Sequence, residues 1–237
     1  MKKNIVIVVS AMNMGGAQRV VSILCNYWSQ SGYTVTLIAT FSREKINHFR
    51  LNEDVTLKYL SNNPFVPTNN ACNLVWKFIQ LRKLIKSRNP DVVISFLTRV
   101  NVATALSTFG IKCSLIICER SWPPFRTLSN KFFWMYRILF KGVDRIIAQT
   151  DKSQKWLSQN FPDNVVTVIP NPMVYPLPLH GRSISPNSVI SPKKKVILAS
   201  GRLQKYKQFD VLIRAFLQIK DKHSDWDLII LGDGEER

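Results

Sequence analysis

GRLQKYKQFD, residues 201–210, decides the fold because of what stands on either side of it. The apolar run 196–200 before it is typical of a buried strand, and apolar residues recur at helical spacing after it: Val211, Leu212, Ala215, Phe216 and Ile219. A strand, a basic turn and a helix in this order direct positive side chains and the free amides of a helix N-terminus to one point, where an anion is stabilised. Arg202 and Lys207 are therefore candidate ligands for a diphosphate.

Length and composition indicate a globular protein with one large domain or two small ones. The chain has 237 residues, of which 46% are hydrophobic and 11% aromatic. Its 33 basic and 15 acidic residues give a formal net charge of +18, which predicts attraction to nucleic acid, anionic lipid or a phosphorylated substrate. Nucleic acid is not expected as a partner, because the basic residues form no known reading motif and the aromatic residues lie mostly in apolar runs.

The cysteines and histidines indicate neither a metal site nor a disulfide framework. The four cysteines include no CxxC pair, and the three histidines stand far apart. Reduced thiols are typical of a cytosolic protein. The apolar run 5–9 is too short for a signal-peptide core, and no run approaches the roughly 18 to 20 apolar residues that cross a bilayer. Any membrane contact is therefore expected to be peripheral.

Alternating strand and helix patterns predict a Rossmann-like first domain. The strand 5–9 is followed by a loop that contains Gly15 and Gly16 and by an amphipathic helix that ends near Gly32. The paired glycines either let the backbone approach a ligand at a helix start or form only a tight turn. Their spacing is not GxGxxG, so a dinucleotide-dependent oxidoreductase is not predicted.

Polar residues follow the predicted strands 92–97 and 115–118 at the point where each strand ends. The carboxyl ends of parallel strands form the edge at which open α/β sheets bind ligands. Asn101, Glu119 and Arg120 are therefore candidate cleft residues. Glu119 and Arg120 could instead pair with each other or with nearby loops.

Two amphipathic segments each have two possible roles. In the first, one apolar stripe lies beside a basic face, and the residues are Leu74, Phe78, Leu81 and Ile85 with Arg82, Lys83 and Lys86. This helix either exposes a solvated charged face or docks on an anionic membrane. The second segment, KFFWMYRILFK at 131–141, is either a core helix with basic ends or a helix in a bilayer interface. After the strand 144–148, Asp151 is predicted to cap the next helix.

Composition divides the chain into three parts. Residues 1–172 form the predicted N-terminal Rossmann-like domain, and the Pro- and Ser-rich run 173–192 is typical of a linker. A second α/β unit begins at residue 193 and includes a predicted strand at 226–231.

Taken in order, these motifs resemble those of the GT-B glycosyltransferases of family 4, retaining enzymes that move a sugar from a nucleotide-diphosphate donor. The resemblance rests on five motifs: GGAQR at 15–19, the VISF and CERS strand ends, VIPNP at 168–172, GRL(x)3K(x)2D at 201–210 and the final LGDGEER. The first half is similar to the branch that builds bacterial surface polysaccharides, such as capsule and lipopolysaccharide, and lipid-linked oligosaccharides.

The resemblance implies two Rossmann-like domains, the first on the acceptor side and the second on the donor side. It implies that Arg202 and Lys207 neutralise the donor diphosphate and that Gly15 and Gly16 face the donor phosphate across an interdomain cleft. It also implies that Asn171 lies near the hinge. Positive charge would then replace a metal ion, so we expect no metal and no cofactor, and a UDP-sugar as the donor.

Two positions depart from the family pattern. Gln208 stands beside Lys207 where a glycine is usual, and Ser95-Phe96 stands where many relatives carry an acceptor-side histidine. No catalytic residue is therefore assigned.

The second unit is short for this family, whose donor domain is a full sheet with an E(x)7E motif beyond the GDG turn. Two parallel strands and one helix leave part of a sheet uncovered. We therefore expect residues 193–237 to be poorly stable, packed irregularly on the first domain or completed by another chain. We also expect a truncated transferase that binds nucleotide sugar weakly and turns it over negligibly.

The sequence thus predicts a glycosyltransferase, or a remnant of one, with a nucleotide-sugar donor and a lipid-linked or polysaccharide acceptor. We expect it in the cytoplasm, peripherally on the inner face of the cytoplasmic membrane, where anionic lipid attracts basic helices. The alternative is a non-catalytic binding module that partners an intact transferase or a membrane.

Overall fold

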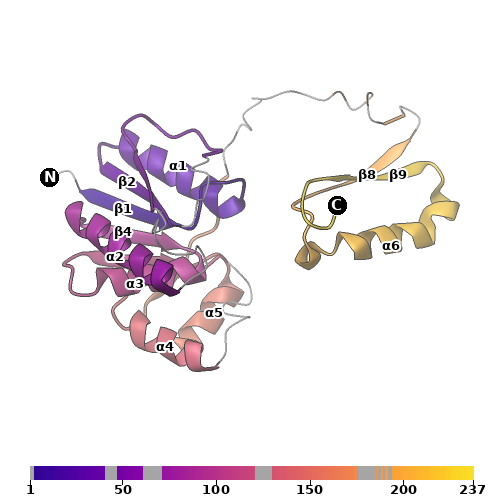
Figure 1. Cartoon of the computed structure of the whole chain (residues 1–237). Helices are drawn as coiled ribbons and strands as arrows, with labels where there is room; N and C mark the ends of the chain where they lie inside the picture. The colour runs from indigo at the N-terminus through magenta and orange to yellow at the C-terminus, as the bar shows by residue number, and fades with distance from the viewer. Residues whose placement is uncertain are drawn as a thin grey trace. The chain divides into compact units, whose positions relative to one another are not determined.

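The computed structural model describes residues 3–40, 47–60, 71–120, 130–173 and 194–237, and five single residues between the last two ranges, at 175, 185, 188, 190 and 191. The chain divides into two compact units, Met1–Val174 and Tyr175–Arg237 (Figure 1). The predicted linker at 173–192 lies largely outside the described residues.

The first unit is built on a seven-stranded parallel sheet with the order β3-β2-β1-β4-β5-β6-β7. Its strands are β1 (Asn4–Val9), β2 (Thr34–Ala39), β3 (Thr56–Tyr59), β4 (Val92–Phe96), β5 (Ser114–Cys118), β6 (Arg145–Ala148) and β7 (Val166–Val168). From β1 the chain first builds outward through β2 and β3 and then returns to add β4 on the other side. This reversal places the topological switch point, where such sheets bind ligands, between β1 and β4. The predicted Rossmann-like fold is confirmed.

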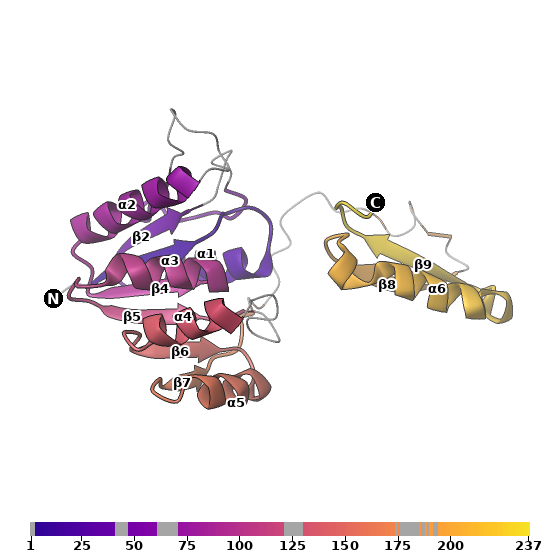
Figure 2. The same cartoon turned by 60° about the horizontal axis from the view of Figure 1, so that its bottom comes forward.

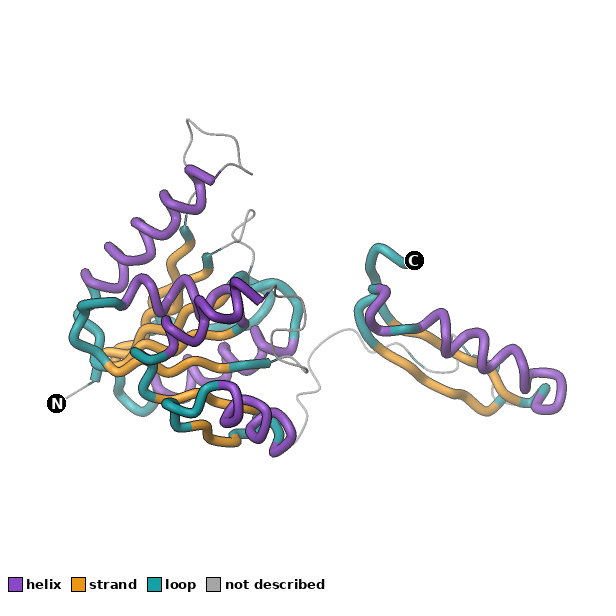
Figure 3. The backbone as a smooth tube through the Cα atoms, turned by 90° about the horizontal axis from the view of Figure 1, so that it is seen from below, coloured by secondary structure: helices purple, strands orange, loops and turns teal. Residues whose placement is uncertain are grey.

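Helices cover both faces of this sheet, as the two views in Figures 1 and 2 show. They are α1 (Gly16–Gln30), α2 (Ala71–Ser87), α3 (Thr98–Thr108), α4 (Asn130–Phe140) and α5 (Asp151–Asn160). One face packs against α1 and the other against α2, α3, α4 and α5. Figure 3 looks onto the second of these faces and shows its helices in front of the strands.

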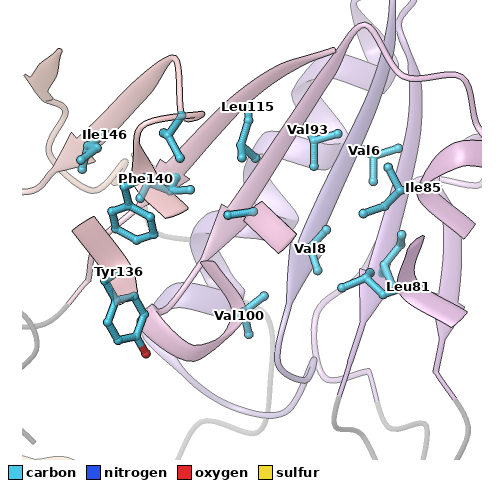
Figure 4. Packing of buried hydrophobic residues seen from close by; sticks show 14 of the residues in the cluster. Val6, Val8, Leu81, Ile85, Val93, Val100, Leu115, Tyr136, Phe140 and Ile146 are labelled. Atoms are coloured by element: carbon cyan, nitrogen blue, oxygen red, sulfur yellow. The ribbon is translucent and has the colours of Figure 1, made fainter. Parts of the chain in front are cut away.

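The core consists of strand residues that alternate between the two faces. Val6 and Val8 of β1 belong to the cluster under α2, α3 and α4 (Figure 4), whereas Ile5, Ile7 and Val9 face α1. Burial on both faces explains why the strand is apolar at successive positions.

The second unit contains the two parallel strands β8 (Lys195–Ser200) and β9 (Trp226–Leu231), the helix α6 (Phe209–Ile219) and the short 3-10 turns η2 (Lys205–Lys207) and η3 (Lys220–His223). Of its residues described from 194 to 237, none is buried. Leu198 and Leu231 are 63% and 52% exposed. Two strands and one helix thus leave apolar surface uncovered, as expected.

One local prediction is wrong. The N-cap of α5 is Thr150, whose Oγ1 accepts a hydrogen bond from the amide of Ser153 at 3.2 Å, and Asp151 is the first residue of the helix. The extended backbone of Thr150, with φ −142°, lets its hydroxyl reach that amide. Asp151 still lies in the first turn, where a carboxylate is favourable.

Candidate functional site

The carboxyl ends of the parallel strands bring several predicted site residues of the first unit to one edge of the sheet. We call this the carboxyl edge and define it by the segments after β1, β4, β5, β6 and β7. Gly15 and Gly16 follow β1, Glu119 and Arg120 follow β5, and Asn171 follows β7. Asn101 lies in the first turn of α3, directly after β4.

A hydrogen-bond network buried beneath this edge joins β4, α3 and β5. Asn101 is its centre: its Oδ1 accepts from Ser95 Oγ at 2.8 Å, and its Nδ2 donates to Glu119 Oε1 at 2.8 Å and to the carbonyl of Cys118 at 3.2 Å. Thr98 Oγ1 donates to Glu119 Oε2 at 2.9 Å. The network fixes where α3 begins relative to the two strands.

Asn101 and Glu119 are 0% and 3% exposed, so they brace the edge and do not line an open cleft. This corrects the sequence-based expectation, which placed both side chains in the cleft. Burial raises the pKa of the Glu119 carboxyl group from 4.5 to about 7, and the hydrogen bonds from Asn101 and Thr98 offset only part of that effect.

The turn from β4 into α3 is strained. Leu97 has φ +78° and ψ 135°, a region that a leucine rarely adopts, and its side chain does not cap α3. The strand therefore turns into the helix without an intervening loop, which brings Thr98 and Asn101 close to β5.

Arg120 points away from its neighbour Glu119. Its guanidinium carbon lies 4.8 Å from the centre of the Phe96 ring, and its Nη1 donates to Asn171 Oδ1 at 2.5 Å. Gln149 Nε2 donates to the same oxygen at 2.7 Å. Of the two alternatives for Glu119 and Arg120, mutual pairing is thus wrong, and each contacts other segments. Burial lowers the pKa of Arg120 from its usual value.

Gly15 and Gly16 form the start of α1. Gly15 is the N-cap with extended backbone, and no side chain caps the helix amides. A Cβ added to Gly16 would meet no atom within 4 Å, whereas one added to Gly15 would lie 2.3 Å from Gln18 Oε1. The helices on either side of the switch point, α1 and α3, thus both begin without a side-chain cap, whereas α5 is capped.

In the second unit, the turn after β8 carries Arg202 and the turn before α6 carries Lys207. Both residues are exposed. The amide of Leu203 donates to the carbonyl of Asp233 at 2.9 Å, which ties the first turn to the GDG turn after β9. A Cβ on Gly232 would lie 1.9 Å from the carbonyl oxygen of Gly201, so only glycine allows this approach.

Gln208, the residue beside Lys207, stands where the family usually has a glycine, and its backbone conformation shows why glycine is favoured there. Gln208 caps α6 with φ +55° and ψ 36°, the left-handed conformation in which glycine is the least strained residue. Glutamine therefore keeps the turn at some energetic cost. Lys207 Nζ lies 5.6 Å from the centre of the Tyr206 ring and remains on the same turn.

Sequence reasoning missed three residues of the carboxyl edge: Thr98, Gln149 and the strained Leu97. Thr98 and Gln149 follow strand ends, so the rule that selected Glu119 could also have selected them. The conformation of Leu97 has no sequence signal, because nothing in a leucine favours a positive φ.

Two further findings concern metals and membranes. Within the described part of the chain, no three His, Cys, Asp or Glu residues are grouped so that they could hold a metal ion. None of the helices that the structure describes has the length and apolar character that a membrane-spanning segment requires.

Comparison with protein families gives two matches that follow each other along the chain. The model described as Glycosyltransferase Family 4 matches residues 14–173, and the model described as Glycosyl transferases group 1 matches residues 182–237.

Curated relatives are similar over nearly the whole chain. An uncharacterized glycosyltransferase of Haemophilus influenzae is 24% identical over 100% of this chain and 63% of its own length. The amylovoran biosynthesis glycosyltransferase AmsD of Erwinia amylovora is 28% identical over 91% of this chain and 62% of its own length. A third relative, from Campylobacter jejuni, is 26% identical over 97% of this chain and 61% of its own length. It is the GalNAc-alpha-(1->4)-GalNAc-alpha-(1->3)-diNAcBac-PP-undecaprenol alpha-1,4-N-acetyl-D-galactosaminyltransferase. The chain thus spans less than two thirds of these relatives.

Solved structures share the fold. Sucrose-phosphate synthase of Thermosynechococcus elongatus superposes with a TM-score of 0.73 at 12% identity and covers 97% of this chain and 62% of that one. Anabaena HepE in complex with UDP superposes with a TM-score of 0.69 at 15% identity, over 99% of this chain and 61% of that one.

Proposed function

This chain belongs to glycosyltransferase family 4, and we propose that it transfers a sugar from a nucleotide-diphosphate donor to a membrane-associated acceptor in cell-surface polysaccharide or oligosaccharide biosynthesis. The observation that carries the proposal is the order of the two family matches, which cover residues 14–173 and 182–237. Relatives that build amylovoran or extend undecaprenol-linked sugars support the pathway class.

The donor contacts that we propose lie in the segment that connects β8 to α6. Arg202 and Lys207 lie in the segment between β8 and the uncapped N-terminus of α6, where their positive charges would stabilise a diphosphate. These charges would also stabilise the nucleotide diphosphate as it leaves, which is the role that a metal ion has in other transferases. We propose a UDP-sugar as donor, since the similar HepE structure holds UDP. We also propose that Gly15 and Gly16 contact the donor phosphate.

The proposal includes transfer with retention of the anomeric configuration and no metal requirement. Both parts rest on the family, and the second is supported by the basic turn that would hold the diphosphate. The Ser95, Asn101 and Glu119 network positions the acceptor-side edge, and we assign no residue of it to proton transfer.

A peripheral membrane position is supported by α4, which has one buried face that belongs to the core and one exposed apolar face. Tyr136 and Phe140 are 4% and 0% exposed and belong to the core, whereas Trp134 and Ile138 are 61% and 68% exposed. Arg137 lies 5.0 Å from the centre of the Trp134 ring. An exposed tryptophan and isoleucine beside a cation are suited to the boundary of an anionic bilayer. We therefore propose that the protein works on the inner face of the cytoplasmic membrane.

Donor binding is tested by calorimetry with UDP and UDP-sugars. We expect binding that is unchanged by EDTA and weakened at least about tenfold in Arg202→Gln and in Lys207→Gln, since each loses a charge-assisted contact. Lys222→Gln is the matched control, because Lys222 is an exposed lysine of the same unit outside the turn. Equal binding by all four proteins would contradict the assigned donor contacts.

Catalysis is tested by incubating the chain with labelled UDP-sugars and anionic vesicles that carry polyprenyl-diphosphate-linked saccharides. Labelling of the lipid is expected to be barely above background, and the labelled product should keep the anomeric configuration of the donor. An inverted product would contradict retention, and donor binding with no labelled lipid would favour a non-catalytic binding module.

A further inference from the structure

We propose that Arg120 is the centre of an anion site on the first unit, formed with Asn171 and Gln149, and that it binds a phosphate or diphosphate group of a substrate. The identity of that substrate rests on the proposed function, whereas the site itself rests on the geometry of these residues.

The guanidinium group of Arg120 is held in place and still has donors to offer. Phe96 lies against it at 4.8 Å, and Asn171 Oδ1 accepts from its Nη1. An arginine carries five N–H donors in a fixed planar fork. The Arg120 guanidinium also contacts the Cys118 side chain and its Nε is buried, so the donors left for a ligand are the remaining N–H groups of the two Nη atoms. A fork that is already oriented loses little conformational freedom when it binds a planar or tetrahedral oxyanion.

The two amides beside Arg120 also present donors. Arginine can only donate, so its contact fixes the Asn171 oxygen toward Arg120, and Gln149 Nε2 donates to that same oxygen. The amide nitrogen of Asn171 therefore faces away from the shared oxygen. Three side chains from the segments after β5, β6 and β7 thus gather donors at one place on the carboxyl edge, which suits an anion.

The positive charge of Arg120 is not balanced by a carboxylate. In the described part of the chain, the ion pairs within 4.0 Å involve other residues. The adjacent Glu119 is turned into the buried network, where it contacts Asn101 and Thr98. A half-buried guanidinium whose oxygen partner is a neutral amide gains more from an anionic ligand than an exposed one does.

Two substrates could supply the phosphate group, the donor and a lipid-diphosphate acceptor. They are distinguished by using three probes separately: inorganic diphosphate, farnesyl diphosphate and UDP. The chain as it stands is titrated with each probe by calorimetry at constant ionic strength, because a protein of net charge +18 also attracts anions without a defined site.

We expect Arg120→Gln to lower the affinity for farnesyl diphosphate, for UDP or for both by a factor of about ten or more. This factor corresponds to the loss of one charge-assisted hydrogen bond. Loss confined to farnesyl diphosphate would place the acceptor in this site, and loss confined to UDP would place the donor there. Arg120→Lys should weaken the same ligand, since an ammonium group neither stacks on Phe96 nor presents a planar fork. Arg145→Gln is the matched control: Arg145 is an exposed arginine at the amino end of β6, on the opposite edge of the sheet, and its loss should change binding less than about twofold.

The unfolding temperature separates binding from a structural role. Arg120→Gln should keep or raise it, because the variant removes a half-buried charge that has no carboxylate partner. Arg120→Lys serves as the second variant if the glutamine protein does not fold. Unchanged affinity for all three probes in either folded variant, or an equal loss in Arg145→Gln, would overturn the anion site.

The outcome is independent of donor binding by the second unit. If Arg202→Gln no longer binds UDP while Arg120→Gln binds all three probes with unchanged affinity, this inference fails and the proposed function stands. If the chain binds farnesyl diphosphate through Arg120 but no nucleotide, the donor proposal fails and the anion site stands.

Discussion

Glu119 accepts hydrogen bonds from Thr98 and Asn101, and burial raises the pKa of its carboxyl group from 4.5 to about 7. The native state therefore binds the proton more tightly than the unfolded state. Between about pH 4.5 and 7 the native protein holds more protons, so the free energy of unfolding decreases as the pH rises through this window. Below the window this contribution of Glu119 is fully present, and above it the contribution is lost.

Glu119→Gln should remove this pH dependence while keeping the shape of the network. Its amide oxygen can accept from Asn101, and its amide nitrogen can donate to the Thr98 hydroxyl, as the O–H of the protonated acid would. Relative to the unaltered chain, the variant should gain up to about 3 kcal/mol of stability between pH 4 and pH 8, from a shift of 1.36 kcal/mol for each pKa unit. Urea unfolding across this range measures the difference, with the exposed Glu53→Gln as control. Parallel stability curves for all three proteins would contradict a raised pKa of Glu119.

The backbone conformation of Gln208 lowers the stability of its turn, because a φ of +55° is unfavourable for any residue with a side chain. A left-handed conformation costs roughly 1 to 2 kcal/mol, and glycine avoids that cost but loses about 0.5 to 1 kcal/mol in chain entropy. Gln208→Gly should therefore be neutral or slightly stabilising, and Gln208→Val, which is β-branched, should be destabilising. Hydrogen exchange of the α6 amides distinguishes them, since valine should lower and glycine should keep the protection. Equal protection in both variants would show that the turn tolerates any residue.

At the scale of elements, the strands and helices were predictable because each follows from a local period. Continuous apolar runs bounded by polar turns predicted the strands at 5–9, 92–97, 115–118 and 144–148, which correspond to β1, β4, β5 and β6. The stripe at Leu81 and Ile85 predicted α2, in which both residues are buried. The same stripe failed at Leu74, which is 63% exposed, since periodicity does not say where the core ends.

The arrangement of the candidate site was less predictable than its residue types. The carboxyl-end rule selected Asn101, Glu119 and Arg120 correctly as residues of one edge. It could not tell that two of them are buried and that the third contacts Asn171, which is 51 positions away along the chain. Such pairings depend on tertiary register, and the positive φ of Leu97 depends on it too.

The turn after β9 supports the turn that carries Arg202, and a single methyl group tests this support. In Gly232→Ala the new Cβ would lie 1.9 Å from the carbonyl oxygen of Gly201, so one of the two turns must move. We expect UDP affinity to fall at least about tenfold, as for the loss of Arg202 itself. Gly142→Ala is the control, because its Cβ would lie 3.9 Å from the nearest atom, the carbonyl oxygen of Leu139. Unchanged affinity in Gly232→Ala would mean that the two turns are not coupled.

For the whole molecule, the two units differ most in what they bury. Strand β1 has five consecutive residues that are at most 7% exposed, Ile5 to Val9, and it is paired on both sides by β2 and β4. Strands β8 and β9 pair only with each other among the described strands, and no described residue from 194 to 237 is buried. Since local opening is cheapest where few apolar contacts are lost, the two units should open with very different free energies.

Native-state hydrogen exchange of the full chain measures this difference. We expect the amides of β1 and β4 to exchange only through global unfolding of the first unit, and the amides of β8, β9 and α6 to exchange at least about 100-fold faster. Ending the chain after Val174 should leave the urea midpoint of the first unit unchanged, because the buried residues of its two core clusters all lie between Ile5 and Phe161. Equal protection of β1 and β8, or a lower midpoint in the shortened chain, would contradict independent stability of the two units. A further rise in the protection of β8 and β9 alone when UDP is added would place the donor on the second unit, since a ligand stabilises only the state that binds it.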